Sequence, residues 1–298
     1  MQLRLRPVGP CRVPRKCTSV VVQLDCDTAN ASIVVIGAHH FGKDPNDVIF
    51  ASVRSVIWRR MLLLEASPLI AQELKHIWHK ERSPAVTPID RVTVLNAGVC
   101  PEERLPVDQL GSLHHAVHDG HHHRLFYTFV GNNSYARAMD GLLPRRVGMH
   151  NGLPYWRGQI GSFDQHHVLK WSEHMLRTYT TLGSDGKLPP LLGRYVVAEP
   201  VQCRPLQSYL RGKHVGGPVG ILLIDTEGFD CRIIGSHDWC DYASAPRMIL
   251  FEHKHCERSD LAAARLRLNL TRCAHRAWPP KQYEEVLFDR DNVAFVLR

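Results

Sequence analysis

The chain has 298 residues, of which 44% are hydrophobic and 22% charged, and its formal net charge at pH 7 is +8. This composition is that of an ordinary globular protein, and the length allows one large domain or two small ones. The basic residues are scattered beyond the N-terminal segment and no zinc-finger or RNA-binding signature accompanies them, so we expect no nucleic-acid partner. No apolar run approaches the roughly 18 residues that a membrane-spanning helix needs.

The nine cysteines show no Cys-x-x-Cys spacing. In a chain of this size, that usage predicts mostly reduced, packed thiols rather than a disulfide framework. The first acid is Asp25 and several arginines precede it, as in organellar transit peptides, but the serine-rich pattern of those peptides is missing. We therefore expect a cytoplasmic location, with an organelle as the alternative.

Residues 1–28 are expected to form an irregular basic arm, because Pro7, Pro10 and Pro14 interrupt any helix. From there to residue 99 the patterns of strand and helix alternate. Strands are expected at 33–36, 61–64 and 92–95, and helices at 48–58 and 69–79. Strands that alternate with helices predict a mostly parallel sheet with helices on both faces.

The segment from about 100 to 217 interrupts this rhythm and is rich in His, Gly, Arg and Pro. A structureless loop of that length is uncommon inside a compact domain. We therefore expect an insertion that packs over the crevice at the carboxyl ends of the strands, where such sheets bind ligands, and that shapes the site for the acceptor substrate. It should contain strands at 124–130 and 195–201 and a helix around 165–179, for which Asp164 is a suitable N-cap.

Six histidines between His114 and His123 could bind a transition metal, because imidazole is the commonest metal ligand. No acidic or cysteine partner stands at a fixed spacing from them, and Gly120 makes the stretch flexible. A solvated loop is the favoured interpretation, and we expect no metal site.

The sheet pattern resumes with strands at 221–224 and 248–251, a helix at 261–270, and a terminal β-hairpin at 284–288 and 293–297. The most informative stretch is the short apolar run that ends in Asp225, Glu227 and Gly228. A buried strand there delivers two acids to its carboxyl end, where open α/β sheets bind ligands. The alternative is that Asp225 caps the following helix and Glu227 faces water.

Four segments occur in the order typical of FkbM-type methyltransferases, and the chain resembles that family from about residue 30 to its end. The segments are residues 33–42, 61–68, 92–99, and the Ile-Asp-Thr-Glu-Gly run followed by residues 246–253. The phrase Gln159-Ile-Gly-Ser-Phe-Asp164 is similar to one in eukaryotic, often algal, members. The resemblance implies one methyltransferase domain over 29–298 that binds S-adenosyl-L-methionine. Its fold would be a doubly wound, Rossmann-like class I methyltransferase sheet with a terminal β-hairpin and a long insertion after the third strand.

The resemblance also implies which residues hold the cofactor. Gly37, Ala38 and Gly42 would form the loop after the first strand, where glycine permits a close approach. Glu65 ends the second strand and would accept hydrogen bonds from the ribose hydroxyls. Asn96 ends the third strand and would face the adenine.

The chain departs from the family at Val35, which stands where an acid is usual, so that one hydrogen-bond acceptor behind the cofactor is lost. The absence of an intact Gly-x-Gly-x-x-Gly fingerprint argues against a dinucleotide enzyme. The first interpretation is therefore methyl transfer to a hydroxyl oxygen of a small molecule or glycan. A catalytically silent binding module is the alternative.

Removal of the acceptor's proton requires a nearby base. Asp225 and His253 are the candidates for that base, and Glu227 is the third catalytic candidate. The alternative for His253 is an ion pair with Glu252 that closes the strand end.

Overall fold

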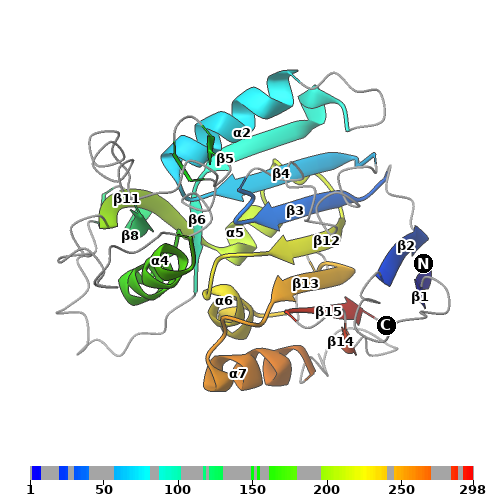
Figure 1. The fold of residues 1–298 in the computed structure, drawn as a ribbon. Coiled ribbons are helices and arrows are strands. Elements are labelled where there is room, and N and C mark those ends of the chain that lie inside the picture. Colours follow the sequence, from blue (N-terminus) through cyan, green and yellow to red (C-terminus); the bar gives the residue numbers. More distant parts are fainter. Residues whose placement is uncertain are drawn as a thin grey trace.

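A seven-stranded sheet forms the centre of the structure, a computed structural model, in the strand order β14-β15-β13-β12-β3-β4-β5 (Figure 1). The residues described are 2–7, 20–25, 30–39, 57–80, 87–101, 117–118, 121–129, 149–150, 153–154, 161–179, 196–239, 245–269, 283–287 and 291–297. The strands of the sheet are β3 (Ser32–Ile36), β4 (Arg60–Glu65), β5 (Val92–Asn96), β12 (Val219–Ile224), β13 (Met248–Glu252), β14 (Tyr283–Leu287) and β15 (Asn292–Leu297).

The five strands from β5 to β13 are mutually parallel, while β15 is antiparallel to both β13 and β14. The chain thus builds outwards from β3 in two directions, first through β4 to β5 and later through β12 to β13. This arrangement confirms the predicted doubly wound sheet and its terminal hairpin. The strands at the centre, β3 and β12, are buried along their whole length.

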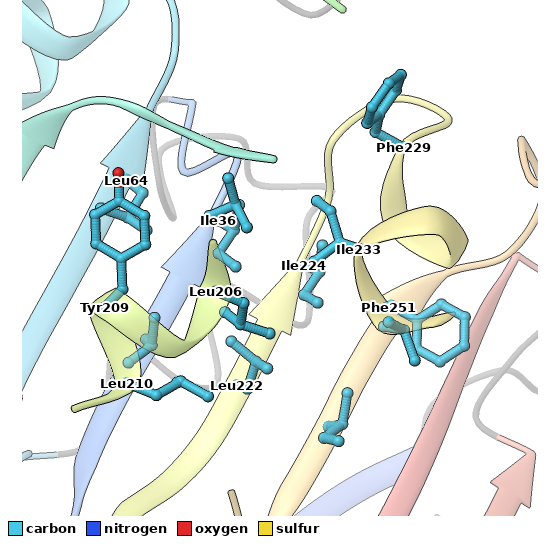
Figure 2. Close-up of a cluster of buried hydrophobic side chains, with 14 of the residues drawn as sticks. Ile36, Leu64, Leu206, Tyr209, Leu210, Leu222, Ile224, Phe229, Ile233 and Phe251 are labelled. Atoms are coloured by element: carbon cyan, nitrogen blue, oxygen red, sulfur yellow. The ribbon is translucent and has the colours of Figure 1, made fainter. Parts of the chain in front are cut away.

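The core consists of two layers, one on each face of the sheet. On one face, α2 (Pro68–Lys80) packs Leu74 and Trp78 against the strands. The other face is covered by α5 (Leu206–Leu210), α6 (Asp230–Ser236) and α7 (Arg258–Asn269). Figure 2 shows α5 over β3, β4 and β12, with Tyr209 beside Leu64 and Leu206 below Ile36. The helices predicted at 69–79 and 261–270 are therefore confirmed, whereas most of the helix predicted at 48–58 lies outside the described residues.

The insertion after β5 builds a second sheet with the strand order β6-β11-β8-β7. Its elements are β6 (Gly98–Cys100), β7 (Val117–His118), β8 (His121–Phe129) and β11 (Val196–Pro205), together with the helix α4 (Gln165–Tyr179) and a short pair, β9 (Met149–His150) and β10 (Leu153–Pro154). In Figure 1 the parallel strands of the main sheet point towards the side on which α4, β8 and β11 lie. The helix predicted around 165–179 is confirmed.

Two expectations about irregular segments are wrong. Residues His118 and His121–His123 lie in β7 and β8 rather than in a loop, because β8 pairs along its length with β11. In the N-terminal arm, β1 (Gln2–Pro7) and β2 (Val20–Asp25) form an antiparallel pair. The alternation of Leu and Arg in β1 is a period-2 pattern typical of a strand, and the proline argument addressed only helices.

The expectation of mostly reduced thiols is also wrong for four cysteines. Cys100 of β6 is bonded to Cys203 of β11, and Cys231 of α6 is bonded to Cys256, which precedes α7. The partners lie 103 and 25 residues apart in the chain, so their proximity is a product of the fold and not of a local motif. None of the helices in the described part of the chain is long and apolar enough to span a bilayer.

Candidate functional site

The strand order of the main sheet reverses between β3 and β12, and open α/β sheets bind ligands at the carboxyl ends of the strands at such a point. At this edge lie the loop after β3, Glu65 at the end of β4, Asn96 at the end of β5, Asp225 after β12 and His253 after β13. The two halves touch directly, because the Asp225 N–H donates to the Ile36 carbonyl at 2.9 Å.

The loop after β3 depends on a glycine. Gly37 has a φ of 74°, and a Cβ at this position would collide with the Asp225 carbonyl. The N–H groups of Gly37 and Ala38 both donate to the Leu64 carbonyl at 3.0 Å. The backbone is thereby held between β4 and β12, where only a residue without a side chain fits. Gly42, the third predicted residue of this loop, lies outside the described residues.

Glu65 is a buried carboxyl group that binds two backbone N–H groups. Its Oε2 accepts from His39 N and its Oε1 from Ser67 N, both at 2.8 Å. Burial raises the pKa of Glu65 to about 7, against the lowering effect of these hydrogen bonds. The backbone N–H of Ala66 also contributes to lowering this pKa, and since a carboxylate offers about four acceptor positions, the group keeps capacity for a hydroxyl donor.

Asn96 is exposed, and its orientation is determined by β4. Its amide nitrogen donates to the carbonyls of Glu65 and Ala66, at 3.0 and 2.9 Å. Both N–H donors of the side chain are thus used, which leaves Oδ1 as the group that can meet a ligand. A ligand beside Asn96 must therefore offer a donor, as the amino group of adenine does.

The turn after β12 is shaped by a buried acid that the sequence analysis did not select. Asp230 is fully buried and accepts hydrogen bonds from Thr226 N at 3.3 and 3.2 Å and from Thr226 Oγ1 at 2.9 Å. Burial raises its pKa to about 6. The alternative in which Asp225 caps α6 is wrong, because the N-cap position is Phe229 and no side-chain cap hydrogen bond forms.

Glu227 lies where this turn, α4 and the loop after β13 meet, a place that we call the recess. Its Oε2 is 3.6 Å from His167 Nε2 and 3.8 Å from His255 Nε2, and His255 Nε2 is 3.6 Å from Glu252 Oε2. We call these four residues, His167, Glu227, Glu252 and His255, the recess cluster. The Glu227 side chain is 30% exposed, so it faces water in part and otherwise lies beside the two imidazoles.

Burial dominates the protonation of the recess cluster. It raises the pKa of Glu227 to about 8, with help from the charge of Asp230, and that of Glu252 to about 9. It lowers the pKa of His255 to about 4 and lowers that of His167 as well. Both imidazoles are therefore neutral at pH 7.

His167 and His255 were not among the residues predicted from the sequence. His167 stands three residues after the α4 cap Asp164, and His255 two residues after His253, but neither spacing is a ligand motif. The predicted partner of Glu252 was His253, and this is corrected, because Glu252 lies beside His255 instead. The His253 N–H donates to the Asp291 carbonyl at 2.8 Å, while its Nε2 is buried without a hydrogen-bond partner among the described residues.

The insertion is attached to this edge of the sheet. Ser162 Oγ donates to the Glu227 carbonyl at 3.2 Å, and the backbone of Ser162 pairs with Tyr127 of β8. Phe163 packs against the ring of Phe229 at 5.8 Å. Asp164 caps α4 by accepting from His166 N at 2.9 Å, as predicted, whereas Gln159 lies outside the described residues.

Comparison with known proteins agrees with this architecture. The sequence profile of the methyltransferase FkbM domain matches residues 36–277, which begin at the end of β3 and include every strand end of the site described above. Comparison with curated proteins gives no match.

Among solved structures, methyltransferase FkbM from Methylobacillus flagellatus KT is similar, with 12% sequence identity and a TM-score of 0.37. The match covers 92% of this chain but only 45% of that one, so the chain spans less than half the length of this neighbour. These values carry no argument by themselves, and the family assignment rests on the profile match over most of the chain. The chain belongs to the FkbM methyltransferase family.

Proposed function

We propose that the chain transfers a methyl group from S-adenosyl-L-methionine to a hydroxyl oxygen of a small molecule or glycan. The observation that carries this proposal is a contact at one sheet edge between two half-sites, the proposed cofactor side after β3 and the proposed acceptor side after β12. Gly37, which stands where the family binds its cofactor, packs directly on Asp225, next to the recess cluster. A methyl donor and an acceptor bound on the two sides of this contact would be neighbours.

The residues on the cofactor side have suitable chemistry. The remaining acceptor capacity of the Glu65 carboxyl group suits the ribose hydroxyls, and Asn96 Oδ1 matches the adenine amino group. The left-handed Gly37 lets the backbone approach the methionine portion. When bound, the cofactor supplies an electrophilic methyl group, and the chain has to align the acceptor oxygen with it.

On the acceptor side, the proposed role of Asp225 is to take the proton of the acceptor hydroxyl, with His253 as the second candidate for this base. General-base assistance of this kind typically contributes a hundredfold to ten-thousandfold in rate. Glu227 would orient the acceptor. The insertion borders the recess through Ser162 and His167, and we propose that it selects the acceptor.

The alternative, a silent binding module, has one observation in its favour. Val35 is fully buried among apolar side chains, so nothing at this position can accept the hydrogen bond that the usual acid would accept. If cofactor affinity were lost in this way, the fold and the recess would persist without methyl transfer.

Isothermal titration with the methylated and demethylated cofactors tests the proposal. A ligand that binds only the native state raises the free energy of unfolding by about 2.7 kcal/mol at a hundredfold excess over its dissociation constant. We expect heat and a rise in melting temperature with wild type, and a strong loss of both with Glu65→Ala. Absence of both signals for wild type at millimolar cofactor would favour the silent module.

A further inference from the structure

The recess cluster combines groups from three separate segments. Glu227 comes from the turn after β12, Glu252 and His255 from the end of β13 and its following loop, and His167 from α4 of the insertion. Ligand-type atoms of Glu227, Glu252 and His255 all lie within 4.8 Å of one another. Side chains from distant parts of the chain thus converge on one small volume.

The separations within the cluster are too long for hydrogen bonds and suit a shared central ion. The Nε2 atom of His255 is 3.6 Å from Glu252 Oε2 and 3.8 Å from Glu227 Oε2, whereas N–H···O bonds span about 2.7–3.2 Å. Ligands bound tetrahedrally at about 2.1 Å from a metal ion are about 3.4 Å apart. The three atoms are therefore placed around a common point and do not bond to one another.

Buried polar atoms in the cluster lack partners. Glu252 Oε2 and His167 Nε2 are both inaccessible to solvent and make no hydrogen bond with any described residue. The His255 side chain, which faces both of these atoms' residues, is only 10% exposed. Since about 90% or more of buried polar groups are hydrogen-bonded, a group of such atoms that face one another indicates an ion or ordered water between them.

We propose that Glu227, Glu252 and His255 bind one divalent transition-metal cation, with His167 beside it as a further nitrogen donor. One imidazole with two carboxylates suits zinc or manganese better than calcium or magnesium, which prefer all-oxygen sites. A cation also compensates two carboxylates that face the same recess. The nearby ammonium group of Lys254 is instead 3.7 Å from Asp291.

The surroundings hold the three ligands in place, as the outer shell of a metal site does. The ring of Trp171 contacts that of His255 edge to face, with centroids 4.7 Å apart. The bond between Cys231 and Cys256 joins α6, which follows Glu227, to the loop that carries His255. A Cβ at Gly228 would lie 3.1 Å from His167 Nδ1, so Gly228 leaves room for this ring.

Three protein ligands leave coordination positions open for a substrate oxygen, as in catalytic metal sites. A hydroxyl bound there would lose its proton more easily, because the cation stabilises the alkoxide. This role rests on the proposed methyl transfer to oxygen. The binding of the cation does not.

Metal binding is tested on the full chain without any acceptor. After removal of bound metals with a chelator, we titrate zinc and manganese separately by calorimetry and count the metal retained after gel filtration by mass spectrometry. We expect one tight equivalent per chain in wild type. Loss of a ligand in His255→Gln or Glu252→Gln should weaken this equivalent by more than the tenfold to hundredfold typical of outer-shell changes.

The matched control is His166→Gln, because His166 neighbours His167 on α4, is exposed and lies outside the cluster. This variant should still bind one metal ion per chain tightly. That result distinguishes binding at the recess cluster from adventitious binding to other histidines. If a variant fails to fold, the wild-type chain loaded with cobalt is measured instead. The visible spectrum of the bound cobalt reports whether nitrogen and oxygen atoms are its ligands, and no residue has to be changed.

The proposal is overturned if wild type retains no stoichiometric metal, or if His255→Gln and Glu252→Gln both bind metal like wild type. A chain that binds S-adenosyl-L-methionine but no metal would refute this inference and leave the proposed function standing. A chain that binds metal but no cofactor would do the opposite.

Discussion

Two residues other than glycine have a positive φ among the described residues, His39 at 40° and Glu227 at 52°. One follows β3 and the other follows β12, so both stand at the point where the strand order reverses. Such conformations cost on the order of 1–3 kcal/mol and persist only where the surroundings enforce them. The strained backbone directs the His39 N–H at Glu65. The strained backbone of Glu227 carries a side chain that belongs to the recess cluster. Both strained residues therefore belong to the two proposed half-sites.

Glu65 makes stability depend on pH in a direction that can be derived. Burial raises its pKa from 4.5 in the unfolded chain to about 7 in the folded one, so the folded state binds more protons between these values. The free energy of unfolding therefore falls as the pH rises from about 4.5 through 7. We expect this decline to be smaller in Glu65→Gln, by up to about 3 kcal/mol.

The measurement is chemical denaturation of both proteins at a series of pH values from 4.5 to 8. The other buried acids contribute equally to wild type and variant, so the difference between the two curves isolates Glu65. Parallel curves would mean that folding does not raise the pKa of Glu65. In wild type, cofactor affinity should rise over the same pH range, because ribose hydroxyls donate to the carboxylate form.

Gly37 allows a comparison between two glycine substitutions. Gly37→Ala introduces a Cβ that collides with the Asp225 carbonyl at a positive φ, so we expect a loss of more than about 2 kcal/mol and of cofactor binding. Gly235→Ala in α6 is the control, because its Cβ would meet no atom closer than 3.7 Å. It should be neutral or stabilise the helix by up to about 1 kcal/mol. Equal melting temperatures for the two variants would contradict this account of the loop.

Asp225→Asn tests the base directly, since it removes proton acceptance with little change in size. We expect methyl transfer in a single turnover to slow by about a hundredfold to ten-thousandfold at saturating cofactor, with cofactor affinity nearly unchanged. The control is Asp90→Asn, because Asp90 is exposed and lies far from Asp225 in the sequence. Wild-type turnover by Asp225→Asn would move the assignment to His253.

At the scale of elements, the recess depends on how α6 is joined to the loop before α7. These two helices pack side by side, and the bond between Cys231 and Cys256 closes a separation of 25 residues. Cross-links that close loops of this size contribute about 3 kcal/mol, mainly by restricting the unfolded chain. The Cys231→Ser and Cys256→Ser double variant should lose about that much stability by chemical denaturation.

The same double variant should also bind zinc more weakly, because the loop that carries His255 is then less restrained. Replacing Cys100 and Cys203 by serine is the control, since that bridge joins β6 to β11 of the second sheet. It should lower stability without a comparable change in metal affinity. An equal effect of the two bridges on metal affinity would argue against a local role for the bond between α6 and the loop.

At the scale of the whole molecule, the two disulfides bear on the compartment. Structural disulfides form and persist mainly in oxidising compartments, whereas the sequence analysis predicted a cytoplasmic location, which stays a prediction. From the two disulfides among the described residues, we expect protein made in an oxidising compartment to have at least four fewer titratable thiols than protein made in a reducing one. Thiol counting under denaturing, non-reducing conditions measures this directly. Equal counts would restore the expectation of reduced cysteines.

Local sequence patterns were sufficient to predict the main sheet. The short Ile- and Leu-rich runs around Ile33, Leu63 and Leu223, bounded by turn residues, predict buried strands because the period of a strand depends only on neighbours in sequence. The carboxyl ends of parallel strands meet at one edge, so Gly37, Glu65 and Asp225 could be predicted to lie near one another without coordinates. The cap at Asp164 was predictable for the same local reason.

Only the tertiary structure brought together groups that belong to different elements. His167 lies 60 residues before Glu227 in the chain, and His255 lies 28 residues after it, so no spacing rule connects them. Their proximity follows from the packing of α4 and of the loop after β13 against the same turn. Likewise, the strand predicted from residue 124 begins earlier, because His122 and His123 pair with Cys203 and Gln202 of β11, and the cysteines paired because the fold placed them in contact. Sequence alone determined which strands form and what their ends carry. Packing between distant segments decided which side chains from other elements meet them.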